Sequence, residues 1–133
     1  MTNLSTSANT ALSVDDQITA LAHLIADAAD DRKAGDITII KVGEVSSLAD
    51  YFVIATGFSK VQVRAIAGAI EDKVEETLNR RPRHLEGMND GTWVLVDYGD
   101  VVAHVLMPDE REYYNLEAFW AHGEQVPFVA KPN

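Results

Sequence analysis

The chain has 133 residues, the size of a single domain, and its apolar share of 47% and charged share of 24% are typical of a folded globular protein. It contains no cysteine, which excludes disulfides, thiolate metal sites and cysteine nucleophiles, and no apolar run approaches the roughly 18 residues of a membrane span, so we expect a soluble, cytoplasmic protein. The formal net charge of −10 argues against a protein that works mainly by neutralising phosphates over a basic face.

The N-terminal part of the chain predicts a tail, one helix and two strands. Residues 1–13 carry no Lys or Arg and no apolar segment, which argues against a targeting sequence, and we interpret them as a disordered tail. Ser13 is a candidate N-cap, and apolar residues at steps of three and four then predict an amphipathic helix that ends near Gly35. Residues 37–42 and 51–56 are rich in β-branched and aromatic side chains, which favours strands.

The middle of the chain predicts a second helix followed by three strands. Ser59 and Gln62 form a capping-box pattern, and the apolar periodicity after them predicts a long helix that runs to about Arg80. A Gly-Asp pair at 99–100 is typical of a tight turn and predicts that the last two strands form a hairpin. The predicted strands are 83–85, 92–97 and 101–107.

An aromatic stripe predicts a third helix near the C-terminus. Asp109 is a candidate N-cap for it, and the helix is expected to end before Gly123. This order of elements predicts an α/β fold, with a mixed β-sheet of about five strands and three main helices packed on it. The predicted domain spans residues 14–123, and residues 124–133 are interpreted as a C-terminal tail.

Three blocks of sequence carry a family resemblance. The first two are strand signatures, and the third is an aromatic helix signature: Asp50-Tyr51-Phe52-Val53-Ile54-Ala55-Thr56-Gly57 with Ser59 and Gln62-Val63; Gly91-Thr92-Trp93-Val94-Leu95-Val96-Asp97-Tyr98-Gly99-Asp100-Val101-Val102 with His104-Val105; and Arg111-Glu112-Tyr113-Tyr114-Asn115-Leu116-Glu117 with Phe119-Trp120. In order and spacing they resemble the Iojap family of ribosomal silencing factors. The resemblance covers roughly residues 14–122, nearly the whole predicted domain.

The resemblance implies a specific function and fold. A member of this family is expected to have a nucleotidyltransferase-like topology, to form a homodimer and to bind the large ribosomal subunit through ribosomal protein L fourteen. Binding there would block joining of the small subunit and repress translation when nutrients are short. It implies no enzymatic activity, no cofactor and no metal. The alternatives are an adaptor for large-subunit assembly and a nucleotide-binding enzyme with a degenerate transferase site.

The hairpin holds the candidate binding residues. Side chains alternate in facing along a strand, so either Val94 and Val96 fill the core while Trp93 and Leu95 face outward, or the reverse. The sequence leaves both options open. An outward Trp93 would be a natural energetic anchor of an interface, and the resemblance favours that orientation. The predicted ribosomal-protein-binding residues are Trp93, Leu95, Asp97 and His104.

Two groups of polar residues raise the alternatives of catalysis and phosphate binding. Asp97, Asp100 and His104 could form an acid–base or metal site, but Asp100 suits a Gly-Asp turn and the spacing is not that of metal ligands. Ser59 and Lys60 stand at a strand-to-helix turn that could receive a phosphate, yet no Walker or Gly-x-Gly-x-x-Gly pattern is present and a helix cap accounts for the serine. We therefore assign no catalytic residue.

One basic cluster stands out in the acidic chain. It consists of Arg80, Arg81, Arg83 and His84, and it fits either a minor contact with ribosomal RNA, made by the three arginines, or favourable charge at a helix C-terminus. The sequence does not decide between these two roles. The aromatic residues of the last helix have acidic neighbours, so we interpret them as packing or dimer contacts and not as a base-stacking platform.

Overall fold

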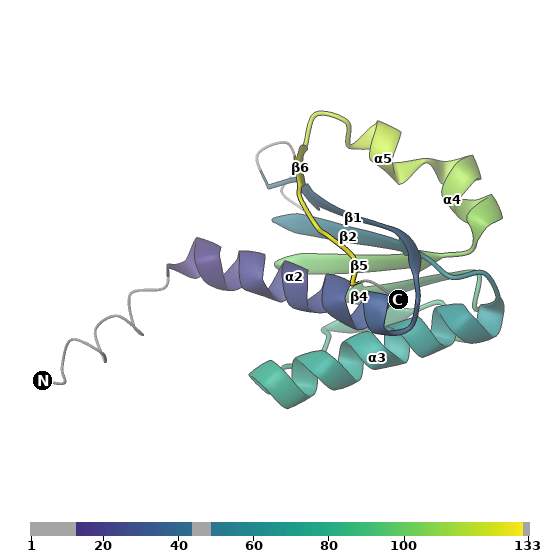
Figure 1. Cartoon of the computed structure of the whole chain (residues 1–133), viewed down its shortest axis with the longest axis horizontal. Coiled ribbons are helices and arrows are strands. Elements are labelled where there is room, and N and C mark those ends of the chain that lie inside the picture. Colours follow the sequence, from purple (N-terminus) through teal and green to yellow (C-terminus); the bar gives the residue numbers. More distant parts are fainter. Residues whose placement is uncertain (1–12, 44–48, 132–133) are drawn as a thin grey trace, which may run out of the picture.

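The computed structural model describes residues 13–43 and 49–131, and the predicted N-terminal tail lies outside these ranges except for Ser13. The described chain folds into one mixed sheet with helices on both of its faces (Figure 1). The elements, in chain order, are α2 (Val14–Asp31), β1 (Gly35–Lys41), β2 (Tyr51–Thr56), α3 (Lys60–Leu78), β3 (His84–Glu86), β4 (Trp93–Asp97), β5 (Val101–Leu106), α4 (Pro108–Tyr114), α5 (Leu116–Phe119) and β6 (Glu124–Val126).

The sheet has six strands in the order β3-β4-β5-β2-β1-β6. The central pair, β2 and β5, is parallel, and the other neighbouring pairs are antiparallel. The predicted α/β class and mixed sheet are thereby confirmed. In Figure 1, α2 and α3 lie together below the sheet, while α4 and α5 lie above it. None of the helices in the described ranges has the length and apolarity that a membrane span requires.

Local sequence signals place the starts of both long helices correctly, although α2 ends at Asp31, before the predicted Gly35, which begins β1. The Ser13 hydroxyl accepts the backbone N–H of Asp16 at 3.0 Å, and the Ser59 hydroxyl accepts that of Gln62 at 3.0 Å, so both predicted caps are confirmed. The Gln62 side chain accepts the N–H of Phe58 at 2.7 Å, one residue earlier than in a standard capping box. The second helix ends at Leu78, because Asn79 adopts a left-handed conformation with φ of 54°.

The prediction of a third helix is wrong in two respects. It is broken into α4 and α5, because Asn115 between them is left-handed with φ of 46°. Asp109 is not the N-cap: Met107 takes that position without a side-chain cap, and Pro108 begins the helix, where its missing N–H costs nothing. The aromatic stripe is therefore presented from two short helices that meet at a bend.

The chain beyond Gly123 is not a tail, as predicted, but part of the sheet. Its residues Glu124–Val126 form the sixth strand, β6, which pairs antiparallel with β1. Phe128 packs against the main core, and the Lys131 ammonium forms an ion pair of 2.8 Å with Asp31 at the end of α2. This segment covers the edge of β1, which would otherwise offer unpaired backbone groups to other chains.

The two faces of the sheet carry different apolar clusters. The face under α2 and α3 holds the larger core, in which Ile25, Ile66 and Val96 have no exposed surface. The opposite face holds a smaller buried cluster around Phe52, Ile54 and Leu106, and partly buried residues pack against its margin: Trp93, Leu95, Leu116 and Trp120. The short helices α4 and α5 bury no residue fully, so this second face is incompletely covered.

Candidate functional site

The orientation of β4, which the sequence leaves open, is settled by the structure. Val94 and Val96 have no exposed surface and point into the core under α2 and α3. Trp93 and Leu95 lie on the opposite face and are partly exposed. The small β-branched side chains of β4 therefore pack in the larger core under the helices. The indole lies on the incompletely covered face.

His104 lies beneath Trp93 on the neighbouring strand. The Trp93 indole N–H donates to His104 Nδ1 across 3.1 Å, and the imidazole edge meets the Phe52 ring at a centroid distance of 4.9 Å. Only 6% of His104 is exposed, and this burial lowers its pKa from 6.5 to about 4, although the nearby charge of Asp97 partly opposes the shift. At neutral pH the imidazole is uncharged and supports Trp93 from below.

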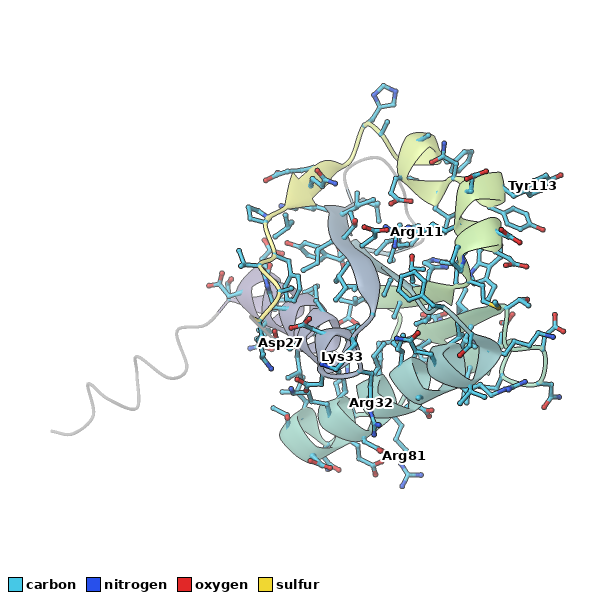
Figure 2. All side chains as sticks on the ribbon, turned by 45° about the vertical axis from the view of Figure 1, so that its right-hand side comes forward. Asp27, Arg32, Lys33, Arg81, Arg111 and Tyr113 are labelled. Atoms are coloured by element: carbon cyan, nitrogen blue, oxygen red, sulfur yellow. The ribbon has the colours of Figure 1, made fainter. Side chains whose placement is uncertain are left out.

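Aromatic side chains extend this surface from β4 onto α4. The rings of Trp93 and Tyr114 lie 4.8 Å apart, and Tyr113 meets Tyr114 edge to face at 5.0 Å. Tyr113 is 81% exposed and projects away from α4 in Figure 2. Sequence reasoning assigned both tyrosines to packing or a dimer contact and missed that Tyr114 adjoins Trp93, although the third family block contains both residues.

Carboxylates flank the apolar centre of the surface. Glu86 on β3 stands opposite Leu95 in the strand register, and Asp97 ends β4 on the same face. Asp97 also accepts the backbone N–H of Gly99 at 2.7 Å, which fixes the turn into β5. We call the surface formed by Glu86, Trp93, Leu95, Asp97 and Tyr114 the open face. It combines an aromatic and aliphatic centre with negative charge at its margin.

The predicted basic cluster is divided by the fold. Arg80 forms a bidentate pair with Asp100, at 3.1 and 3.2 Å, and donates to the carbonyl of Tyr98, so it braces the β4–β5 turn. Arg81 pairs with Glu75 at 3.1 Å and points away from the end of α3 (Figure 2). Arg83 is exposed, and its side chain lies against Gly99 in the same turn. Carboxylates meet two of the three positive charges, so the three arginines are not all free for a contact with RNA.

A hollow lies beside the carboxyl end of β2. It has a volume of about 630 Å³ and is lined by residues that include Asp36, Phe58, Glu112 and Arg111. Arg111 points from α4 toward the sheet (Figure 2), and its guanidinium donates to the hydroxyls of Thr56 and Thr38 and pairs with Glu117. Since these internal partners use the guanidinium and the other charged lining residues are acidic, the hollow does not suit a phosphate.

The polar groups singled out as candidate catalytic residues take part in structural contacts. Asp97 and Asp100 are used in the hairpin turn, and His104 is covered by Trp93. Among the residues that the structure describes, no group of three or more His, Asp or Glu side chains could hold a metal ion. The hydroxyl of Ser59, the other candidate, is used as the cap of α3.

The fold and the site define a small α/β protein whose most distinctive surface is an exposed sheet face, not a cleft with reactive groups. The family model described as "ribosomal silencing factor during starvation" (RsfS) matches residues 15–132. The chain therefore belongs to the RsfS family, and the resemblance to Iojap proteins is confirmed. This description places the family in ribosome-associated control of translation.

Individual relatives agree with this assignment. The chain is 46% identical over 97 residues to the ribosomal silencing factor RsfS of Bacillus subtilis, covering 73% of this chain and 81% of that protein. It is 36% identical over 115 residues to the chloroplastic protein Iojap of Arabidopsis thaliana, covering 85% of this chain but only 48% of that longer protein. A crystal structure of a Chromobacterium violaceum protein, 37% identical, superposes with a TM-score of 0.75 over 86% of this chain and 93% of that one.

Proposed function

We propose that this protein binds the large ribosomal subunit through ribosomal protein L fourteen and represses translation by hindering the joining of the small subunit. Membership of the RsfS family, matched over residues 15–132, is the observation that carries the proposal. The open face supplies the contact surface, with Trp93 and Leu95 at its centre. Occupation of a subunit-interface surface would exclude the small subunit by direct competition.

The chemistry of the open face supports a protein partner over an RNA partner. Aromatic side chains dominate the energetics of protein interfaces, and Trp93 presents part of its ring beside Leu95 on a rigid strand. Carboxylates at the margin and the net charge of −10 would repel phosphates but complement the Lys- and Arg-rich surface of a ribosomal protein. Any contact of Arg80, Arg81 and Arg83 with ribosomal RNA is accordingly a minor part of the proposal.

We also propose that the protein is a homodimer and that α4 and α5 contribute to the contact. Phe119 on α5 is 74% exposed and Tyr113 on α4 is 81% exposed, and exposed aromatic side chains on consecutive short helices favour association. Light scattering of the purified protein would report the mass directly. A Phe119→Ser variant should shift the population toward monomer, whereas Val61→Ser, which alters an equally exposed apolar residue on α3, should not.

The test of the main proposal is sedimentation of purified ribosomal subunits with and without the protein. We expect the protein to travel with the large subunit and the peak of joined subunits to shrink. Leu95→Asp should abolish both effects, because it places a charge at the centre of the open face, while Val61→Asp, on the opposite side of the sheet, should abolish neither. A protein that stays at the top of the gradient while the subunits join normally contradicts the proposal.

A third outcome of that experiment separates silencing from assembly. If the protein travels with the large subunit but joining is unaffected, the contact exists without competition for the interface. An adaptor for large-subunit assembly would then explain the binding, and cells lacking the protein should accumulate immature large subunits. Normal subunit profiles in such cells would count against the adaptor role.

A further inference from the structure

The indole N–H of Trp93 points into the protein, not outward. It donates to His104 Nδ1 over 3.1 Å, so this nitrogen acts as the acceptor and the proton of the neutral imidazole resides on Nε2. A tryptophan has a single polar group. Once that group is bonded internally, the part of Trp93 that remains exposed is ring carbon.

On the side of Nε2, the His104 imidazole is held by packing alone among the described residues. The imidazole lies on β5 opposite Leu95, with the Phe52 ring at 4.9 Å, and 6% of the residue is exposed. Its Nε2 is buried, and among the described residues it has no hydrogen-bond partner. An apolar residue of similar size would fill the same space without an unpaired polar atom. Within the described ranges, the imidazole makes a single polar contact, the bond to Trp93.

We propose that His104 is a positioning residue for Trp93: it accepts the indole N–H inside the protein, fixes the ring plane on the open face and removes hydrogen-bonding capacity from the surface that the partner meets. This inference rests on the proposed function, because it describes how the open face is prepared for its partner. We expect that His104 itself does not touch the partner, because it is almost fully buried and lies beneath Trp93.

The arrangement specifies the chemistry of the contact. A partner atom that meets the exposed ring carbon of Trp93 gains nothing from being a hydrogen-bond acceptor. A basic side chain suits the open face, because its apolar stem can pack on the indole while its charge meets the carboxylates of Glu86 and Asp97.

Two substitutions at position 104 test the positioning role. His104→Asn keeps a neutral acceptor near the place of Nδ1, whereas His104→Leu fills a similar volume and accepts nothing. The first readout is hydrogen exchange of the Trp93 indole N–H by NMR, with a Trp120→Phe variant to assign the two indole signals. The second is affinity for the purified large subunit. Val102→Ala on the same strand and face serves as the control for loss of packing.

We expect slow indole exchange in the wild type, in His104→Asn and in Val102→Ala, and fast exchange in His104→Leu. Affinity should fall about tenfold in His104→Leu, the equivalent of one ordinary hydrogen bond, and should be restored to within about threefold by His104→Asn. Exchange in the wild type as fast as in free indole would overturn the inference. Equal losses of affinity in His104→Leu and Val102→Ala would do the same, because packing would then account for the effect.

The outcome is separable from that of the proposed function. If the wild type fails to bind the large subunit, the proposed function fails. The indole exchange rates of the His104 variants still decide whether the imidazole positions Trp93. If the wild type binds and the exchange rates do not respond to His104→Leu, the proposed function stands and the positioning role is refuted.

Discussion

Trp93 and Val94 are neighbours on β4 whose side chains lie on opposite faces of the sheet, so substitutions at the two positions separate binding from stability. Trp93→Ala should weaken large-subunit binding by at least about 2 kcal/mol, as expected for a central aromatic anchor, and lower the melting temperature only slightly. Val94→Ala opens a cavity at a fully buried site and should lower the free energy of unfolding by about 2 kcal/mol without weakening binding. Sedimentation and thermal denaturation measure the two effects, and unfolding of Trp93→Ala would refute the surface role.

The buried imidazole of His104 makes stability depend on pH. Folding lowers its pKa from 6.5 to about 4, because burial disfavours the charged form. Between these values the unfolded chain binds a proton that the folded chain does not, so the free energy of unfolding falls as the pH falls from about 6.5 to about 4. Over this pH range the titration of His104 lowers the free energy of unfolding by about 3 kcal/mol in total.

Urea denaturation at a series of pH values measures this loss. His104→Asn provides the control, since it lacks the titrating group and should show a flatter profile over the same window. Identical profiles for the two proteins would mean that His104 titrates normally in the folded state. It would then be more open to water than the structure indicates.

At the scale of elements, Arg111 supplies a polar tie between the two short helices, α4 and α5, and the sheet. Arg111 is 11% exposed and bonds Thr56, Thr38 and Glu117. Arg111→Met keeps the stem but leaves two hydroxyls and a carboxylate without their partner, and it should lower the free energy of unfolding by about 2–3 kcal/mol. Amide hydrogen exchange should quicken mainly in α4 and α5.

A surface ion pair supplies the contrast. Arg81 is 80% exposed at its side chain, so Arg81→Ala, which removes its pair with Glu75, should cost less than about 1 kcal/mol. If the Arg81 and Arg111 variants lose the same free energy of unfolding, the contacts of Arg111 contribute no more to stability than an exposed ion pair. In that case, packing of Leu116 and Trp120 on the sheet would hold the two short helices in place.

The same elements show what the sequence can and cannot predict. The starts of α2 and α3 were predictable, because each depends on a serine directly before the helix. Its hydroxyl accepts the backbone N–H of the residue three positions further on. The break at Asn115 was missed although it has a local signal, since asparagine is one of the few residues that readily adopt the left-handed conformation at a helix end. The strand β6 was not predictable, since its partners Ile39–Lys41 lie near the other end of the chain and its own sequence is mostly polar.

The orientation of the candidate residues on the sheet could be predicted only in part. The second sequence block placed Trp93 and Leu95 correctly, yet four consecutive apolar residues on β4 could not reveal which two face the core. The burial of His104 and its bond to Trp93 depend on the register between β4 and β5, which alternation does not give. The sequence therefore assigned Trp93 and His104 the same predicted role without separating the partly exposed residue from the buried one.

At the scale of the whole molecule, the two faces of the sheet differ in how completely the helices cover them. One face is closed by the long helices and holds the larger core, while the other is left partly open by two short helices. A surface built on paired strands within the sheet is rigid, so little conformational freedom is lost when a partner binds. The acidic character of the chain then acts over a longer range than these contacts and bears on how fast a basic partner arrives.

The last prediction concerns that long-range effect. Glu86→Gln combined with Asp97→Asn neutralises the margin of the open face, and the amide oxygen introduced at position 97 can still accept the Gly99 N–H. Association with isolated L fourteen should slow several-fold at low salt and depend less on ionic strength, while dissociation changes little, because exposed charges act mainly on the encounter rate. Asp72→Asn combined with Glu76→Gln makes the same change of charge on α3, across the sheet, and should slow association less. Stopped-flow measurements over a salt series give these rates. Equal slowing by both pairs would mean that only net charge matters and that the open face does not meet the partner.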